Sequence, residues 1–198
     1  MKRVAAVVTA AGFSRRYGAA SKLHALLDGE PLLAHVLRGL SRVPLAMRLV
    51  VIARDDAATS ALVTAAGCAH SVNPDPAAGL GASIATGIRA LPDGLDGAFV
   101  VLGDMPFATA DSYGALLAAF EALPADAIVA PVCGGRRGHP VLFGAAHFPA
   151  LSVLTGDTGA RALLREAQVV EVNVADPGVL TDIDTPEELA AAQRRGGA

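Results

Sequence analysis

Aromatic residues and cysteines are scarce in this sequence. There is no Trp, aromatic residues make up 4% of the 198 positions, and the only cysteines are Cys68 and Cys133. Two distant cysteines without a paired spacing argue against a disulfide framework and against a thiolate metal site, so we expect a reducing compartment. Because 53% of the residues are hydrophobic, the interior must be built mainly from Ala, Val and Leu.

Large charge blocks and long apolar runs are also missing. The formal net charge is -3, and like charges cluster only in pairs such as Arg15-Arg16. This pattern predicts neither a nucleic-acid partner nor a membrane surface. No apolar stretch approaches the roughly 20 uncharged residues of a membrane-spanning helix. The first apolar run is short and passes straight into Gly12, which favours a cytoplasmic first strand over a signal peptide.

Short apolar runs alternate with longer helical patterns along the chain. The expected strands are 4–9, 49–53, 98–102, 127–131 and 169–174. The expected helices are 31–40, 80–91, 112–123, 159–167 and 185–194, the last opening with a Thr-Pro-Glu-Glu capping box. Continuous rather than alternating hydrophobicity predicts strands covered on both faces, and hence a three-layer α/β/α architecture with a mostly parallel sheet. The run 141–143 interrupts the alternation and is expected in a smaller antiparallel annex. We expect one domain, 1–198.

A glycine-containing loop follows the first expected strand. Small residues let backbone amides approach a ligand, while a hydroxyl and two cations suit a polyphosphate. The residues with these properties are Ala10, Ala11, Gly12, Ser14, Arg16 and Lys22. The glycines at 12 and 18 are six apart and Lys22 stands four past Gly18, so the dinucleotide fingerprint and the P-loop pattern both fail. The alternative is a solvent-exposed loop between a strand and a helix, whose charged residues bind no ligand.

Three aspartates form candidate metal ligands. Asp104 directly follows an apolar strand, and in an open parallel sheet ligands bind at that carboxyl edge. Asp182 and Asp184 precede the last helix and share one side if the segment is extended, so either one could complete a site with Asp104. Oxygen ligands suit Mg²⁺, whereas the five histidines show no Zn²⁺ spacing. Turn formation is the alternative role for Asp104 and Asp182.

Two further loops are candidates for binding. The segment 73–83 enters a helix, whose amino end suits an anion or a base edge, although a simple helix cap is the alternative. The run 141–143 is preceded by Arg136, Arg137 and His139. These side chains suit the phosphate group of a second substrate, the acceptor, although paired arginines and turn histidines are often only solvated. Asp157 is interpreted as a cap of the following helix, with a wall of the acceptor pocket as the alternative.

The loop at 9–22 resembles the signature of nucleotidyltransferases with a Rossmann-like, glycosyltransferase-A-like fold. That signature reads small-small-Gly-x-Ser-x-Arg-x-Gly, a short gap, then Lys. The resemblance extends over nearly the whole chain and, within the MobA-like NTP transferases, is strongest to the molybdenum cofactor cytidylyltransferases. It implies Mg²⁺-dependent transfer of CMP from CTP to the molybdenum-pterin cofactor, with release of pyrophosphate. A molybdoenzyme or its chaperone would be a further partner.

The resemblance also implies roles for individual residues. It divides the domain into a nucleotide-binding part, about 1–105, and an acceptor-binding part, about 106–198. Asp104 and Asp184 would hold Mg²⁺, because the family's second ligand stands directly before Thr-Pro-Glu. The catalytic set would be Arg16, Lys22 and Asp104, with both cations neutralising the departing pyrophosphate. The nucleotide would contact Ala10, Ala11, Gly12, Ser14, Gly79 and Ser83, and the acceptor would contact Arg137 and His139.

Other functions stay open from the sequence. Cytidylyl enzymes of this kind carry Ala-Ala-Gly where guanylyl relatives carry Ala-Gly-Gly, and a methyl group at Ala11 would crowd a purine. GTP-dependent guanylyl transfer to the same cofactor and cytidylyl transfer to a sugar or polyol phosphate are the alternatives within the class. A non-catalytic nucleotide sensor or cofactor chaperone is the alternative outside it, although such a module would not need both metal ligands.

Overall fold

The computed structural model describes residues 1–12 and 21–196, and its centre is a mixed sheet built around the first strand. Within these residues the sheet has eight strands in the order β10-β7-β9-β6-β1-β4-β5, with β8 paired to β7. The strands are β1 (Val4–Ala10), β4 (Met47–Ala53), β5 (Ala69–Asn73), β6 (Gly97–Leu102), β7 (Ile128–Cys133), β8 (Arg136–Arg137), β9 (Val141–Gly144) and β10 (Val169–Asn173). A separate hairpin consists of β2 (Leu26–Leu27) and β3 (Glu30–Pro31).

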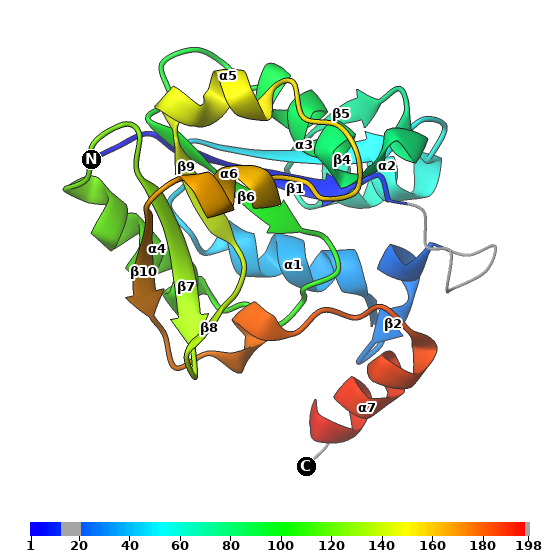
Figure 1. Ribbon diagram of the computed structural model, residues 1–198. Helices are drawn as coiled ribbons and strands as arrows, with labels where there is room; N and C mark the ends of the chain where they lie inside the picture. The colour runs from blue at the N-terminus through cyan, green and yellow to red at the C-terminus, as the bar shows by residue number, and fades with distance from the viewer. Residues whose placement is uncertain (13–20, 197–198) are drawn as a thin grey trace.

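Both faces of this sheet are covered by helices (Figure 1). Side chains of a strand alternate between faces, so Val4, Ala6 and Val8 pack into one core while Ala5 and Val7 pack into another. The first core lies under α1 (Leu32–Ser41), α2 (Ala57–Ala65) and α4 (Ala110–Glu121). The second lies under α3 (Gly79–Arg89), α5 (Phe148–Leu151) and α6 (Arg161–Glu166). The expected three-layer, Rossmann-like fold with a mostly parallel sheet is therefore confirmed.

Strand β9 is where the expected topology was wrong. The run 141–143 does form a strand, but β9 lies inside the main sheet, antiparallel to both β6 and β7, and not in an annex. All four of its residues are buried. The chain turns back at Gly134 and Gly135, which have φ values of 56° and 75°, and too few residues separate β7 from β9 for a crossover helix. An antiparallel insertion is the arrangement that such a short connection permits.

Several elements were not predicted from the sequence, and α2 and β5 are the longest of them. Helix α2 contains few large apolar residues and buries only Thr59 and Val63. Strand β5 is an edge strand with mostly polar or exposed residues, and Asn73 is its one buried position. Neither segment has the apolar periodicity on which sequence-based assignment depends.

The final helix, α7 (Pro186–Gly196), lies beside the β2–β3 hairpin and away from the sheet (Figure 1). Gln193 donates a side-chain hydrogen bond to the carbonyl of Leu26, and Ile183 packs with Leu27 and Leu32. These contacts bring the segment before α7 to the carboxyl edge of the sheet. No helix in the described part of the chain is long and apolar enough to cross a membrane.

Candidate active site

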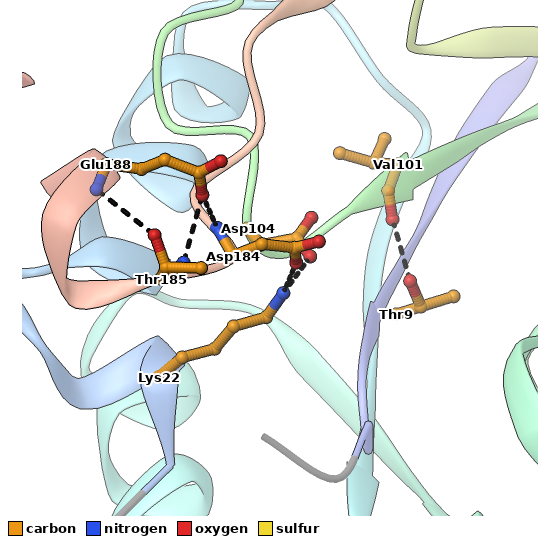
Figure 2. Close-up of polar contacts among 7 residues, drawn as sticks. All are labelled: Thr9, Lys22, Val101, Asp104, Asp184, Thr185 and Glu188. Carbon is orange, nitrogen blue, oxygen red and sulfur yellow. Dashed lines mark hydrogen bonds and ion pairs between the residues drawn. The ribbon is translucent and has the colours of Figure 1, made fainter. Parts of the chain in front are cut away.

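Three charged side chains from distant parts of the chain meet at the carboxyl edge of β1 and β6. The Lys22 Nζ atom lies 2.5 Å from Asp104 Oδ2 and 2.6 Å from Asp184 Oδ1. These partners are 82 and 162 residues away from Lys22 in the sequence. Figure 2 shows the lysine nitrogen in contact with both carboxylates. We call Lys22, Asp104 and Asp184 the charged cluster.

The backbone around each aspartate holds the cluster in place. Asp104 follows β6, and its carbonyl accepts a hydrogen bond from the Ile183 amide at 3.0 Å, which ties the C-terminal segment to the sheet edge. The amides of Asp184 and Thr185 donate to Glu188 Oε2, and the Glu188 amide donates to Thr185 Oγ1 (Figure 2). This is the capping box that the sequence predicted, and it positions Asp184 directly before α7.

Within residues 1–12 and 21–196, the charged cluster combines one ammonium group with two carboxylates. Burial alone would lower the pKa of Lys22, but attraction and hydrogen bonding from Asp104 and Asp184 outweigh it and raise that pKa above its ordinary value of 10.5. The lysine is therefore protonated at neutral pH, and one ammonium group faces two carboxylates. Asp104 Oδ1 is buried and has no hydrogen-bond partner among residues 1–12 and 21–196. A further cation at this point would be stabilised electrostatically.

A cavity of about 470 Å³ opens beside the cluster, between the carboxyl edge of the sheet and the amino end of α3. Edges of this kind are where open α/β sheets bind ligands. Of the residues singled out in the sequence, those lining the cavity are Gly12, Lys22, Gly79, Ser83, Asp104, Asp157, Asp182 and Asp184. The structure thus brings together residues from both ends of the chain that the sequence could nominate only one motif at a time.

The turn at 155–159 packs against the beginning of α3. Gly79 has a φ of +88°, and a Cβ atom there would lie 2.5 Å from Asp157 Oδ1. The Gly156 amide donates to the Ala78 carbonyl at 2.7 Å, and the Gly81 amide donates to the Gly156 carbonyl at 2.8 Å. Helix α6 begins after Ala160 without a side-chain cap. The interpretation of Asp157 as the cap of that helix was therefore wrong, and its side chain borders the cavity.

The two residues expected to meet the acceptor do not line this cavity. Arg137 lies on β8 and its Nη2 atom pairs with Glu171 Oε1 at 2.7 Å on the surface. His139 is largely enclosed, and its Nδ1 atom has no hydrogen-bond partner in the described part of the chain. Burial lowers the pKa of His139, and attraction from Asp104 opposes that shift. His139 thus lies within electrostatic reach of the charged cluster, whereas Arg137 is already paired elsewhere.

The remaining predicted residues of the glycine-containing loop divide into two groups. Ser14 and Arg16 lie outside the described residues. Ala10 and Ala11 are buried, with 4% and 2% of their surface exposed, and only Gly12 of this triplet borders the cavity.

Asn73, which was not given a role from the sequence, forms a buried polar pair with Ser83. Asn73 Nδ2 donates a hydrogen bond to Ser83 Oγ at 3.1 Å, and only 1% and 3% of these residues is exposed. The sequence offered one signal for this pair: Asn73 is a polar residue directly before the loop that enters a helix.

The fold and the site define a class of protein, the nucleotidyltransferases with a Rossmann-like fold. The sequence matches the MobA-like NTP transferase domain over residues 6–172. The chain therefore belongs to the MobA-like NTP transferase family and is a nucleotidyltransferase.

Curated relatives are similar at modest identity. The purine catabolism protein PucB of Bacillus subtilis is 34% identical over 124 residues, which cover 61% of this chain and 58% of PucB. A phosphoenolpyruvate guanylyltransferase of Mycolicibacterium paratuberculosis is 30% identical over 173 residues, covering 83% of this chain and 73% of that protein. The molybdenum cofactor cytidylyltransferase of Escherichia coli is 28% identical over 123 residues, covering 62% and 61%. The chain spans about three fifths of the length of PucB and of the Escherichia coli enzyme.

Solved structures share the fold over nearly their whole length. A Mycobacterium sp. strain JC1 homologue of the Mycobacterium tuberculosis protein Rv0371c superimposes with a TM-score of 0.80 at 27% identity, covering 98% of both chains. A nucleotidyl transferase from Methanothermobacter gives a TM-score of 0.82 at 19% identity, covering 98% of this chain and 97% of that one. Rv0371c itself has been solved as a manganese complex, with a TM-score of 0.80 at 21% identity, covering 97% and 98%.

Proposed function

We propose that this nucleotidyltransferase transfers CMP from CTP to the molybdenum-pterin cofactor, giving the cytosine dinucleotide cofactor and pyrophosphate, with Mg²⁺ as the metal. The observation that carries the chemistry is the meeting of Lys22, Asp104 and Asp184 beside one cavity. The choice of acceptor is supported by the Escherichia coli relative, and the choice of CTP by Ala11. A molybdoenzyme or its chaperone would receive the product.

The residues present fit a divalent metal. Carboxylate oxygens of Asp104 and Asp184 converge on one point, now taken by the Lys22 ammonium group, and Asp104 Oδ1 is buried with no partner in the described residues. No group of three or more His, Cys, Asp or Glu suited to a metal occurs in that part of the chain. Mg²⁺ needs few protein carboxylates because it keeps waters and phosphates as ligands. When bound, it supplies Lewis-acid polarisation of the α-phosphate.

The side chains and backbone of the site would bind the substrates in position and stabilise the charge of the leaving group. Lys22, together with Arg16, would neutralise the pyrophosphate as it leaves. Gly12 and Gly79 allow the nucleotide to approach the backbone, and Ser83 meets the base or ribose. Ala10 and Ala11 would act from their buried positions next to Gly12, and Ser14 adds a hydroxyl to the loop. A phosphate monoester acceptor is already ionised at neutral pH, so the site needs no general base.

The acceptor side rests on fewer observations. We infer that about 1–105 bind the nucleotide and about 106–198 bind the acceptor within a single domain. His139 would face the acceptor from its enclosed position near Asp104. Arg137 would meet the acceptor phosphate only by exchanging its present partner, Glu171.

Guanylyl transfer is the second candidate. The phosphoenolpyruvate guanylyltransferase relative matches a larger share of this chain, 83%, than the cytidylyltransferase relative, 62%. Its name points to GTP as donor and to a small phosphorylated acid as acceptor. A carboxylate-bearing acceptor of this kind would still use Lys22 and the two aspartates.

Competition between donors and acceptors distinguishes the two candidates. The protein is incubated with Mg²⁺, labelled CTP or GTP, and either molybdenum cofactor or phosphoenolpyruvate, and the product is identified by mass spectrometry. We expect CMP on the molybdenum cofactor. Exclusive formation of the phosphoenolpyruvate guanylyl product would refute the proposal in favour of the second candidate. Ala11→Gly tests the base choice, since it should raise the GTP rate relative to the CTP rate.

A further inference from the structure

The buried pair of Asn73 and Ser83 lies directly behind the cavity. Ser83 lines the cavity and Asn73 does not, so Asn73 can influence a ligand only through the groups that it holds. The two side chains are 1% and 3% exposed, which leaves no room for the amide to turn toward solvent. A buried amide and hydroxyl of this kind are held by specific hydrogen bonds.

The orientation of the Asn73 amide follows from its second hydrogen bond. The backbone amide of Asp75 donates to Asn73 Oδ1 at 3.0 Å. A backbone N–H can only donate, so the oxygen of Asn73 must face Asp75 and the NH₂ group must face Ser83. Asn73 Nδ2 therefore donates to Ser83 Oγ at 3.1 Å, and the reverse arrangement would place two donors against each other at Asp75.

This arrangement decides what Ser83 can offer a ligand. A hydroxyl has one hydrogen and two lone pairs, and one lone pair is used by Asn73. No acceptor for the Ser83 hydrogen is found among residues 1–12 and 21–196. Ser83 therefore keeps its hydrogen and one lone pair for a ligand in the cavity that it lines.

We propose that Asn73 is a positioning residue that holds the Ser83 hydroxyl so that its hydrogen can be donated to the carbonyl O2 of a pyrimidine base. This inference rests on the proposed function, because it assumes that the base lies at the beginning of α3. Cytosine and uracil both carry O2 as an acceptor.

Reversing the polarity of the pair tests the inference. In Asn73→Asp the carboxylate still accepts from the Asp75 amide, but it now also accepts from Ser83 and takes up the hydroxyl hydrogen. A lone pair of Ser83 then faces the base carbonyl. We expect the Kd for CTP and for UTP to rise about tenfold in this variant, because a hydrogen bond is lost and two acceptors then face each other. In Ser83→Ala only the hydrogen bond is lost, and we expect a rise of about fivefold. Isothermal titration calorimetry with Mg²⁺ measures both.

The matched control is a triphosphate that has neither base nor sugar. Binding of inorganic tripolyphosphate should be the same in wild type, Asn73→Asp and Ser83→Ala, because the change is confined to the base side. In the Ser83→Ala background, Asn73→Asp should change the Kd for CTP less than twofold, since the hydroxyl through which Asn73 acts is gone. At saturating acceptor, KM for CTP should rise while kcat stays unchanged.

Asn73→Ala is the second variant, in case the buried carboxylate prevents folding, which circular dichroism would detect. It leaves the hydroxyl free to rotate, so a smaller rise in Kd than in Ser83→Ala is expected. The inference is overturned if Asn73→Asp and Asn73→Ala bind CTP like the wild type, or if tripolyphosphate binding falls equally. A wild type that binds CTP in a Ser83-dependent way but transfers no nucleotide refutes the proposed function alone.

Discussion

On one side of the cavity Lys22, Asp104 and Asp184 meet through charge, and on the other side Asn73 and Ser83 meet through one neutral hydrogen bond. The charged partners are 82 and 162 residues apart and their side chains are 17% to 36% exposed, whereas the neutral pair spans ten residues and is almost completely buried. Buried neutral groups are satisfied by each other, but charges need counter-charges or water. We infer that the charged side is built to exchange partners and that the neutral side is built to stay unchanged.

The largest effect should come from the charged side. Asp104→Asn removes one of two converging negative charges and replaces one carboxylate oxygen with an NH₂ group that cannot ligate a metal, and we expect transfer activity to fall about 10²- to 10³-fold. The fold should remain, because the Asp104 carbonyl and not its side chain bonds Ile183. Steady-state kinetics with CTP, together with thermal unfolding, measures both. Normal turnover in this variant would contradict the assignment of the metal site.

Comparing the transfer rates of Asp184 and Asp182 variants should show which of the two aspartates acts together with Lys22 and Asp104. Asp184 contacts Lys22 at 2.6 Å, and Asp182 borders the same cavity without a resolved contact to the lysine. Asp184→Asn should lower the transfer rate about 10²-fold and Asp182→Asn less than about tenfold. Equal losses, measured as kcat/KM for CTP, would mean that the two aspartates share the role.

Replacing the lysine tests whether the charged side exchanges partners. Lys22→Met removes the ammonium group that lies between the two carboxylates, so Mn²⁺ should bind the free protein about tenfold more tightly, as expected for the loss of a competing, partly screened cation. Electron paramagnetic resonance of free Mn²⁺ gives the affinity without any turnover. The same variant should lose transfer activity, because nothing at position 22 then neutralises pyrophosphate. An unchanged Mn²⁺ affinity would show that lysine and metal do not compete.

We expect the smallest effect from Asp176, which stabilises the segment that leads to Asp184. Asp176 accepts hydrogen bonds from Ser112, Thr109 and Gly178, and so joins the start of α4 to the segment that leads to Asp184. Burial alone would raise the pKa of Asp176, but these hydrogen bonds outweigh it and lower the pKa below 3.8. Asp176→Asn should lower the free energy of unfolding at pH 7 by about 1 kcal/mol, since solvent screens this partly exposed group.

The pH dependence of that loss has a definite sign. A lowered folded-state pKa means that the stabilisation is fully present above pH 3.8 and is lost as the pH falls through the folded-state pKa. Urea unfolding of wild type and Asp176→Asn should therefore converge at low pH. A difference that persists undiminished under strongly acidic conditions would contradict the role of the ionised carboxylate.

Most of the elements could be predicted from the sequence, because their patterns are local. The apolar runs at 4–9 and 98–102 became β1 and β6, and the Thr-Pro-Glu-Glu motif became the capped start of α7. The position of β9 could not be predicted, since an apolar run of three or four residues does not specify its neighbours. Asp157 was assigned to the wrong contact for the same reason: a cap and a cavity wall look alike until the turn at 155–159 is packed on α3.

The sequence by itself determined the class of chemistry: a small-residue loop with cations, an aspartate after an apolar strand, and an Asp-Thr-Pro-Glu motif before a helix. It also determined the layered fold, because hydrophobic continuity and periodicity are properties of neighbouring residues. Only the tertiary structure decided that Lys22 pairs with both Asp104 and Asp184, that Arg137 pairs with Glu171, and that Asn73 donates to Ser83. These depend on which distant groups share one point in space, and charge and hydrogen-bond polarity act through space, not along the chain.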